Sequence, residues 1–121
     1  MASILIIDDD EQVLAMLGQT LEREGYDVVK AFEGEAAVMQ YREQPTDLII
    51  TDLLMPGQEG LETIIELRRE FPDVKIIAMS GGGRINPGHI LNLAKGLGAQ
   101  YTFMKPVDRK ELLDAIQEMI G

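Results

Sequence analysis

Near the start of the chain stands the stretch Ile4-Leu5-Ile6-Ile7-Asp8-Asp9-Asp10. Four consecutive apolar residues, three of them β-branched, are typical of a strand that is buried on both faces. Three aspartates follow this apolar run directly. A second stretch, Asp47-Leu48-Ile49-Ile50-Thr51-Asp52, has the same design and also ends in acid. Strands of this kind predict a parallel sheet with helices on both faces.

Apolar runs alternate with amphipathic helical patterns along the whole chain. Strands are expected at 4–7, 27–30, 47–51, 74–79 and 101–104, and helical patterns lie at 13–21, 35–42, 61–71, 90–97 and 112–120. Asn86 before Pro87 and Asp108 before Glu111 predict two helix starts, because each places a capping residue ahead of an apolar pattern. The order predicts an α/β fold of (βα)5 type, a doubly wound, parallel five-stranded sheet.

Composition and charge narrow the class of protein. The 121 residues include 11 basic and 21 acidic side chains, so the formal net charge is -10. This balance argues against direct contact with nucleic acid or with a membrane of anionic lipid, both of which need cationic side chains. No cysteine is present, which excludes disulfides and thiol chemistry. With no signal-peptide pattern and no long apolar run, we expect a cytoplasmic single domain over residues 1–121, with no output domain in this chain.

Polar residues follow four of the five expected strands. The first strand runs into Asp8 and Asp9, the third into Asp52, the fourth into Ser80 and the fifth into Lys105. In open parallel sheets the functional site lies beyond the carboxyl ends of the strands. The sequence therefore predicts a pocket of carboxylates with one hydroxyl and one ammonium group.

Such a pocket needs a cation. Two carboxylates ~4 Å apart repel each other by about 4 kcal/mol at an effective dielectric constant near ~20. Mg2+ fits, because it is a hard ion that carboxylates hold together with water and phosphate oxygens. Lys105 can offset part of the repulsion and bind a phosphoryl oxygen. Since a carboxylate can attack phosphorus, the set predicts metal-assisted phosphoryl transfer to an aspartate.

Simpler interpretations exist for each signal taken alone. Asp10 is expected to be the N-cap of the first helix. Ser80 could be an ordinary loop hydroxyl, and Lys105 could be surface charge. The glycines at 81–83 lack the Lys-Ser/Thr ending of a phosphate-binding loop and favour a simple turn. The sequential placement at four strand ends is what favours a common site.

The motifs together resemble a known family over essentially the whole chain. The matching pieces lie at 4–10, 47–57, 60–62, 76–81, 98–99 and 105–106. In this order and spacing they are similar to the receiver domain of bacterial two-component response regulators. The resemblance implies a flavodoxin-like sheet with strand order 2-1-3-4-5.

The resemblance also implies roles for the acidic residues. Asp52 matches the family's phospho-acceptor. Asp8 and Asp9 match the acidic pair that holds Mg2+, with Asp9 and Asp52 as direct ligands. A third ligand in the family is a backbone carbonyl, and that position here is Leu54.

Ser80 matches the family's switch hydroxyl, and Lys105 matches its phosphoryl-binding lysine. By resemblance, a histidine kinase or phosphotransfer protein donates the phosphoryl group, and the chain is a switch that assists its own phosphorylation and dephosphorylation. Phosphorylation would change the surface over 80–105 for a downstream protein or for a lost output domain. The sequence leaves open whether phosphorylation leads to a homodimer.

Three departures from the family pattern stand out. The aromatic residue that usually precedes the lysine by three positions is Thr102, while Tyr101 and Phe103 are expected on the opposite face of the strand. The loop at 81–86 is long and rich in glycine, and we expect it to be mobile or to be restructured by a partner. The side chain of Leu54 has no polar group to guide water, which favours slow self-hydrolysis.

Two other functions remain as alternatives. A metal-dependent phosphohydrolase with an aspartate nucleophile uses similar groups, but usually has an Asp-x-Asp pair on one strand and a cap domain. A degenerate receiver that acts only as a binding module is the second alternative. The presence of Asp8, Asp9, Asp52, Ser80 and Lys105 argues against it.

Overall fold

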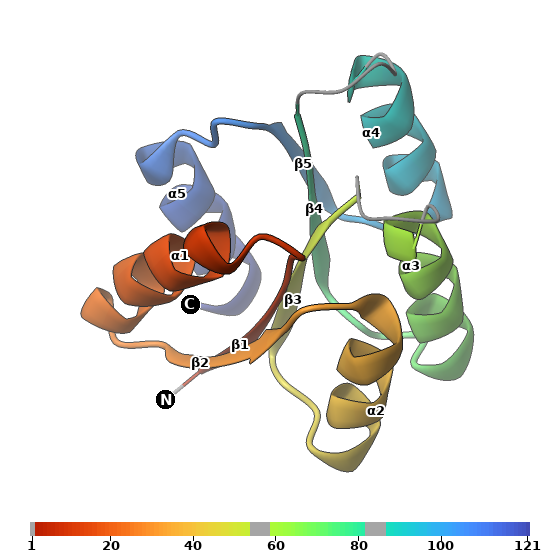
Figure 1. The fold of residues 1–121 in the computed structure, drawn as a ribbon, viewed down its shortest axis with the longest axis horizontal. Coiled ribbons are helices and arrows are strands. Elements are labelled where there is room, and N and C mark those ends of the chain that lie inside the picture. Colours follow the sequence, from red (N-terminus) through yellow and green to blue (C-terminus); the bar gives the residue numbers. More distant parts are fainter. Residues whose placement is uncertain (1, 54–58, 82–86) are drawn as a thin grey trace.

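The computed structural model describes residues 2–53, 59–81 and 87–121 (Figure 1). Its strands are β1 (Ser3–Ile7), β2 (Asp27–Ala31), β3 (Leu48–Asp52), β4 (Ile76–Ser80) and β5 (Tyr101–Met104). Its helices are α1 (Glu11–Arg23), α2 (Gly34–Glu43), α3 (Glu59–Glu70), α4 (Pro87–Leu97) and α5 (Arg109–Ile120). The elements alternate as the sequence predicts.

The five strands form one parallel sheet in the order β2-β1-β3-β4-β5. This confirms the predicted 2-1-3-4-5 topology. Figure 1 shows α1 and α5 on one face of the sheet and α2, α3 and α4 on the other. All carboxyl ends of the strands therefore meet at the same edge, where the chain changes direction into the helices.

The core consists of two apolar layers, one on each face of the sheet. Leu5 and Ile7 belong to the layer under α2, α3 and α4, whereas Ile4 and Ile6 belong to the layer under α1 and α5. All four side chains are fully buried. Burial of one such side chain stabilises the fold by about 1.5–3 kcal/mol. The unbroken apolar run is thus explained, because neither face of β1 meets water.

The largest difference from the predicted strand boundaries is at the start of the fourth strand. We expected the fourth strand to begin at Val74, but β4 begins at Ile76. The Val74 amide donates to the carbonyl of Phe71 in a turn, at 3.0 Å. The side chain of Gln100 then accepts from the Ile76 amide at 2.8 Å and donates to the Val74 carbonyl at 3.3 Å. The Gln100 side chain thus bonds backbone groups that would otherwise pair with a neighbouring strand. The apolar pattern of the sequence does not reveal this substitution of a side chain for a strand.

Capping residues confirm two helix starts. The Asp10 carboxylate accepts from the amides of Gln12 and Val13 at the start of α1. The Asp108 carboxylate accepts from the amides of Lys110 and Glu111 at the start of α5. Each cap satisfies two amides that have no partner within the helix. The predicted cap at Asn86 lies outside the described residues.

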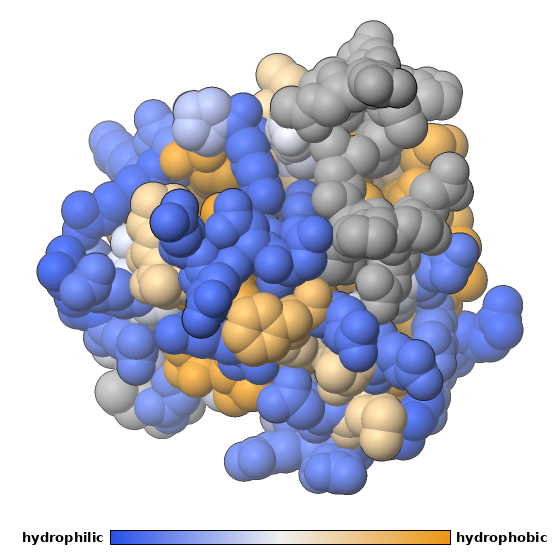
Figure 2. Space-filling view, in the orientation of Figure 1, coloured by the Kyte–Doolittle hydropathy of each residue, from blue (hydrophilic) through white to orange (hydrophobic). Residues whose placement is uncertain are grey.

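The surface is mostly polar on the face drawn in Figure 2, where apolar residues form smaller patches between hydrophilic ones. The exposed large apolar side chains in the described ranges include Met16, Phe32, Met39, Ile65, Leu93 and Met104. Within these ranges, no helix has the length and apolar character that crossing a membrane requires.

Candidate functional site

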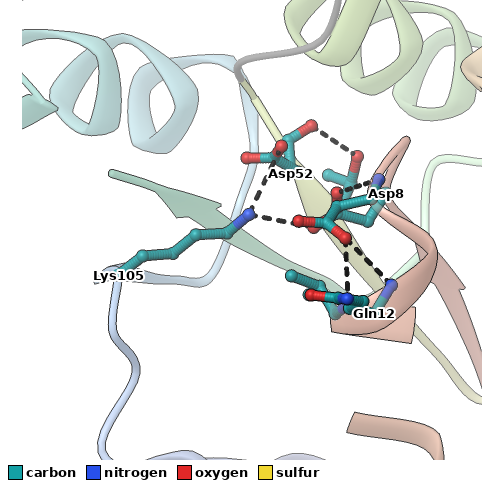
Figure 3. A network of polar contacts seen from close by, with 7 residues as sticks. Asp8, Gln12, Asp52 and Lys105 are labelled. Carbon is teal, nitrogen blue, oxygen red and sulfur yellow. Dashed lines mark hydrogen bonds and ion pairs between the residues drawn. The ribbon is translucent and has the colours of Figure 1, made fainter. Parts of the chain in front are cut away.

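Four strands deliver polar side chains to one edge of the sheet. Asp8 and Asp9 follow β1, Asp52 is the last residue of β3, Ser80 is the last residue of β4, and Lys105 follows β5. Because β1, β3, β4 and β5 are neighbours in the sheet, their carboxyl ends lie side by side. Figure 3 shows the Lys105 side chain extending toward Asp8 and Asp52.

Asp8 is held in place by three hydrogen bonds. Its amide donates to the Ala31 carbonyl at 3.2 Å. One carboxylate oxygen, Oδ1, accepts from the Asp10 amide at 2.9 Å, and the other, Oδ2, accepts from Lys105 Nζ at 2.9 Å. The residue is only 1% exposed. A buried carboxylate of this kind needs such partners, because its desolvation is otherwise costly.

Lys105 bridges two carboxylates. Its Nζ lies 2.9 Å from Asp8 Oδ2 and 3.4 Å from Asp52 Oδ2. Burial by itself would lower the pKa of the ammonium group, but the hydrogen bond to Asp8 and the charge of Asp52 outweigh it, so the net pKa is raised. The group therefore stays charged throughout the neutral pH range, and its favourable pairing is lost only as the pH rises through this raised pKa.

Three carboxylates converge beside the lysine. Asp8, Asp9 and Asp52 each offer one oxygen, and these oxygens all lie within 4.8 Å of one another. Asp8 and Asp52 are buried, whereas Asp9 is exposed. One ammonium group cannot balance three negative charges. A set of hard oxygen donors with excess negative charge, open on one side, fits a divalent cation such as Mg2+.

Ser80 is a buried polar residue with an unusual environment. Its hydroxyl Oγ has no hydrogen-bond partner within residues 2–53, 59–81 and 87–121. Leaving a buried hydroxyl without a partner costs about 1–3 kcal/mol. Its backbone carbonyl, in contrast, accepts from the Lys105 amide at 2.9 Å. The serine backbone is thus tied to the lysine, while its hydroxyl is left able to donate.

The structure separates the three consecutive acids predicted after the first strand. Asp8 and Asp9 join the cluster, and Asp10 is the helix cap, as the sequence predicts. The backbone carbonyl predicted at Leu54 and the loop at 82–86 lie outside the described residues. Sequence reasoning missed Thr51, whose buried hydroxyl donates to the Asp52 carbonyl at 3.1 Å. The only signal for it was a polar residue within an apolar strand.

The predicted orientation of β5 is confirmed. Tyr101 and Phe103 pack against the layer under α1 and α5, with parallel rings whose centroids are 6.4 Å apart. Thr102 alternates with them and pairs with Ala78 of β4, a residue of the opposite layer. The face of β5 toward α4 therefore carries threonine at the position where the family pattern has an aromatic ring.

Comparison with known proteins agrees with this geometry. The sequence model of the family described as response regulator receiver domain matches residues 4–117. Response regulator GtcR of Aneurinibacillus migulanus is 36% identical over 118 residues, which are 98% of this chain and 47% of that protein. The chain thus spans about half the length of this curated relative. It spans about a quarter of the length of a second one, transcriptional regulatory protein GlrR of Escherichia coli.

Solved structures give the same result. A response regulator receiver domain protein from Clostridium thermocellum superposes with a TM-score of 0.90 at 30% identity, covering 99% of this chain and 94% of that one. The response regulator TrrA from Thermotoga maritima, solved in complex with Mg(2+)-BeF, superposes with a TM-score of 0.87 at 29% identity, covering 99% and 100%.

Proposed function

The chain belongs to the response regulator receiver domain family, a family of phosphorylatable switches in two-component systems, and from this premise we propose that Asp52 is the phospho-acceptor. The observation that carries the proposal is the bridge from Lys105 to Asp8 and Asp52 beside a three-carboxylate cluster. Asp52 supplies the nucleophilic oxygen. Lys105 holds the attacked phosphoryl group against it.

The cluster supports Mg2+ as the cofactor. Asp9 and Asp52 would hold the ion directly, and Asp8 would support it from beside Lys105, as in the pattern that this chain resembles. When bound, the ion neutralises negative charge on the phosphoryl oxygens. The predicted backbone ligand at Leu54 is part of this proposal.

The transfer step follows from these groups. A bond forms between a carboxylate oxygen of Asp52 and phosphorus, and the bond from phosphorus to the donor's leaving atom breaks. The leaving group keeps that electron pair. Lys105 stays protonated because its pKa is raised, so it acts as a fixed positive charge and not as a base.

Phosphorylation then changes the balance of contacts at the site. A phosphoryl group adds about -1.5 to -2 of charge and strong acceptor oxygens. Lys105 gains a stronger partner than the Asp52 carboxylate, and the Ser80 hydroxyl, which has no partner in the described part of the chain, gains an acceptor. Because the Ser80 carbonyl is bonded to the Lys105 amide, the ends of β4 and β5 respond together. The surface over 80–105 is the proposed readout.

The partners follow from this role. We propose a histidine kinase or phosphotransfer protein as donor, and a downstream protein or an output domain as the receiver of the signal. The chain acts as a switch that assists its own phosphorylation and hydrolysis, and not as an enzyme for separate substrates. The acidic surface argues against direct nucleic acid contact.

The test is phosphorylation by a small acyl phosphate in the presence of Mg2+, followed by intact mass measurement. The wild-type protein should gain one phosphoryl group, and Asp52→Asn should gain none. Asp10→Asn is the matched control, since it removes a neighbouring acid but keeps a good N-cap residue. A wild-type protein that forms no adduct and binds no beryllium fluoride at any Mg2+ concentration contradicts the proposal. Steady turnover of phosphate esters would favour the phosphohydrolase.

A further inference from the structure

We propose that Gly60 is a positioning residue for Asp52, because only glycine lets the start of α3 close onto the backbone that carries this carboxylate. The inference rests on the proposed function of Asp52 as phospho-acceptor. Gly60 is buried and lies in the first turn of α3. A Cβ atom added there would lie 2.5 Å from the Asp52 carbonyl oxygen and 2.6 Å from Leu53 Cα.

The need for glycine at this position is steric. The backbone of Gly60 does not adopt a positive φ, unlike Gly25 and Gly98. Any residue could therefore take its conformation, and only the contact excludes a side chain. The three nearest atoms that a Cβ would meet are backbone atoms of Asp52 and Leu53, which cannot swing aside as the end of a long side chain can.

The opposite side of this segment is also fixed. The Leu53 amide donates to the Met79 carbonyl of β4 at 2.9 Å, and the Leu53 side chain is only 2% exposed. The Thr51 hydroxyl donates to the Asp52 carbonyl. The segment is thus clamped between β4 and α3. A methyl group at position 60 must move either the helix or the acceptor backbone.

Movement of this backbone would alter the site directly. The Asp52 carboxylate lies 3.4 Å from Lys105 Nζ, and its oxygen is part of the cluster that spans no more than 4.8 Å. Phosphoryl transfer depends on such distances, and a misplacement of ~1 Å can cost ~100-fold in rate. We expect Gly60→Ala to slow phosphorylation by a small acyl phosphate by about 10- to 100-fold.

The experiment compares Gly60→Ala with Leu67→Ala. Leu67 lies on the same helix in the fully buried core, away from the carboxylates, so its truncation weakens the packing of α3 without touching Asp52. Both variants are made in a parent protein that carries Gly18→Ala in α1 and Gly96→Ala in α4. These two substitutions are expected to raise stability through helix propensity and so to offset the stability that each variant loses. Phosphorylation rate per folded molecule is measured together with the 13C signal of the Asp52 carboxyl group and the 15N signal of Lys105 Nζ.

Gly60→Ala should lose rate and shift both NMR signals, while Leu67→Ala keeps the rate and signals of its parent. The inference is overturned if the two variants behave alike, or if Gly60→Ala matches the parent. A parent that forms no adduct contradicts the proposed function instead. In that case, the Asp52 and Lys105 signals still decide whether Gly60 positions the carboxylate.

Discussion

At the scale of single residues, three consecutive acids do three different things. Asp8 is buried and pairs with Lys105, Asp9 is exposed at the open side of the cluster, and Asp10 caps α1. The difference arises because each successive residue after β1 points in a new direction as the chain leaves the sheet. Identical side chains at adjacent positions therefore have different roles, which the composition alone does not show.

The glycines inside helices make a prediction at the same scale. Gly18 lies in the middle of α1, and a Cβ there would meet the flexible end of the Lys30 side chain, with Cε at 2.7 Å. That side chain can turn aside, so we expect Gly18→Ala to stabilise the protein by about 0.5–1 kcal/mol in urea unfolding, through helix propensity.

Two further glycines serve as its controls. Gly96→Ala should also stabilise, because no atom of the described residues outside its own stretch of helix lies within 4 Å of the added Cβ. Gly98→Ala should destabilise, because Gly98 has a φ of +125° and its Cβ would lie 2.6 Å from Arg68 Nε. A Gly18→Ala protein that unfolds at lower urea than the wild type would show that Lys30 cannot give way.

At the scale of elements, α2 and α3 are joined by a bidentate ion pair. Arg42 Nε donates to Glu70 Oε1 at 2.7 Å, and its second nitrogen donates to Oε2 at 2.8 Å. The hydrogen bond from Arg42 lowers the pKa of the Glu70 carboxyl below its ordinary value. A lowered pKa means that the pair stabilises the fold above the ordinary pKa of the acid, and that this contribution is lost as the pH falls through the lowered pKa.

We therefore expect Arg42→Gln to raise the pKa of Glu70 and to reduce stability at neutral pH by a small amount that vanishes in acid. An NMR titration of the Glu70 carboxyl group measures the first effect, and urea unfolding at several pH values measures the second. Arg109→Gln is the control, since Arg109 lies 4.0 Å from Glu24 and makes a looser pair. An unchanged Glu70 pKa in Arg42→Gln would mean that the ion pair does not persist in solution.

At the scale of the whole molecule, the excess of acid is divided between a general surface and one site. The formal net charge of -10 favours solubility and repels other anions. The three clustered carboxylates instead repel one another, and a bound divalent ion offsets this repulsion. Mg2+ should therefore stabilise the folded protein by more than sodium does at equal ionic strength.

This difference can be measured by thermal unfolding with and without Mg2+. We expect a clear rise in the Tm of the wild type. When Mg2+ is at ~10 times its Kd, binding should add about 1.4 kcal/mol to the free energy of unfolding. The rise should be lost or much reduced in Asp9→Asn and kept in Asp10→Asn, which removes the same charge from the neighbouring position. Equal responses in the two variants would assign the effect to general screening.

The sequence alone predicted most of the architecture and the members of the site. Unbroken apolar runs such as 4–7 identify strands that are buried on both faces, and parallel strands bring their carboxyl ends to one edge by geometry alone. The positions of Asp8, Asp9, Asp52, Ser80 and Lys105 after those strands were therefore enough to group them. The start of β4 was missed because a side chain, Gln100, replaces strand pairing there.

The tertiary structure decided how these residues act on one another. The pairing of Lys105 with Asp8 and Asp52 joins segments that are distant along the chain. The burial of the Ser80 hydroxyl without a partner among the described residues, and the close approach of Gly60 to the Asp52 backbone, likewise follow from how the elements pack. Periodicity reports which face of an element is buried, but it carries no information on distances between elements. The list of groups in the site thus follows from the local pattern, and their geometry follows from the packing of strands and helices against one another.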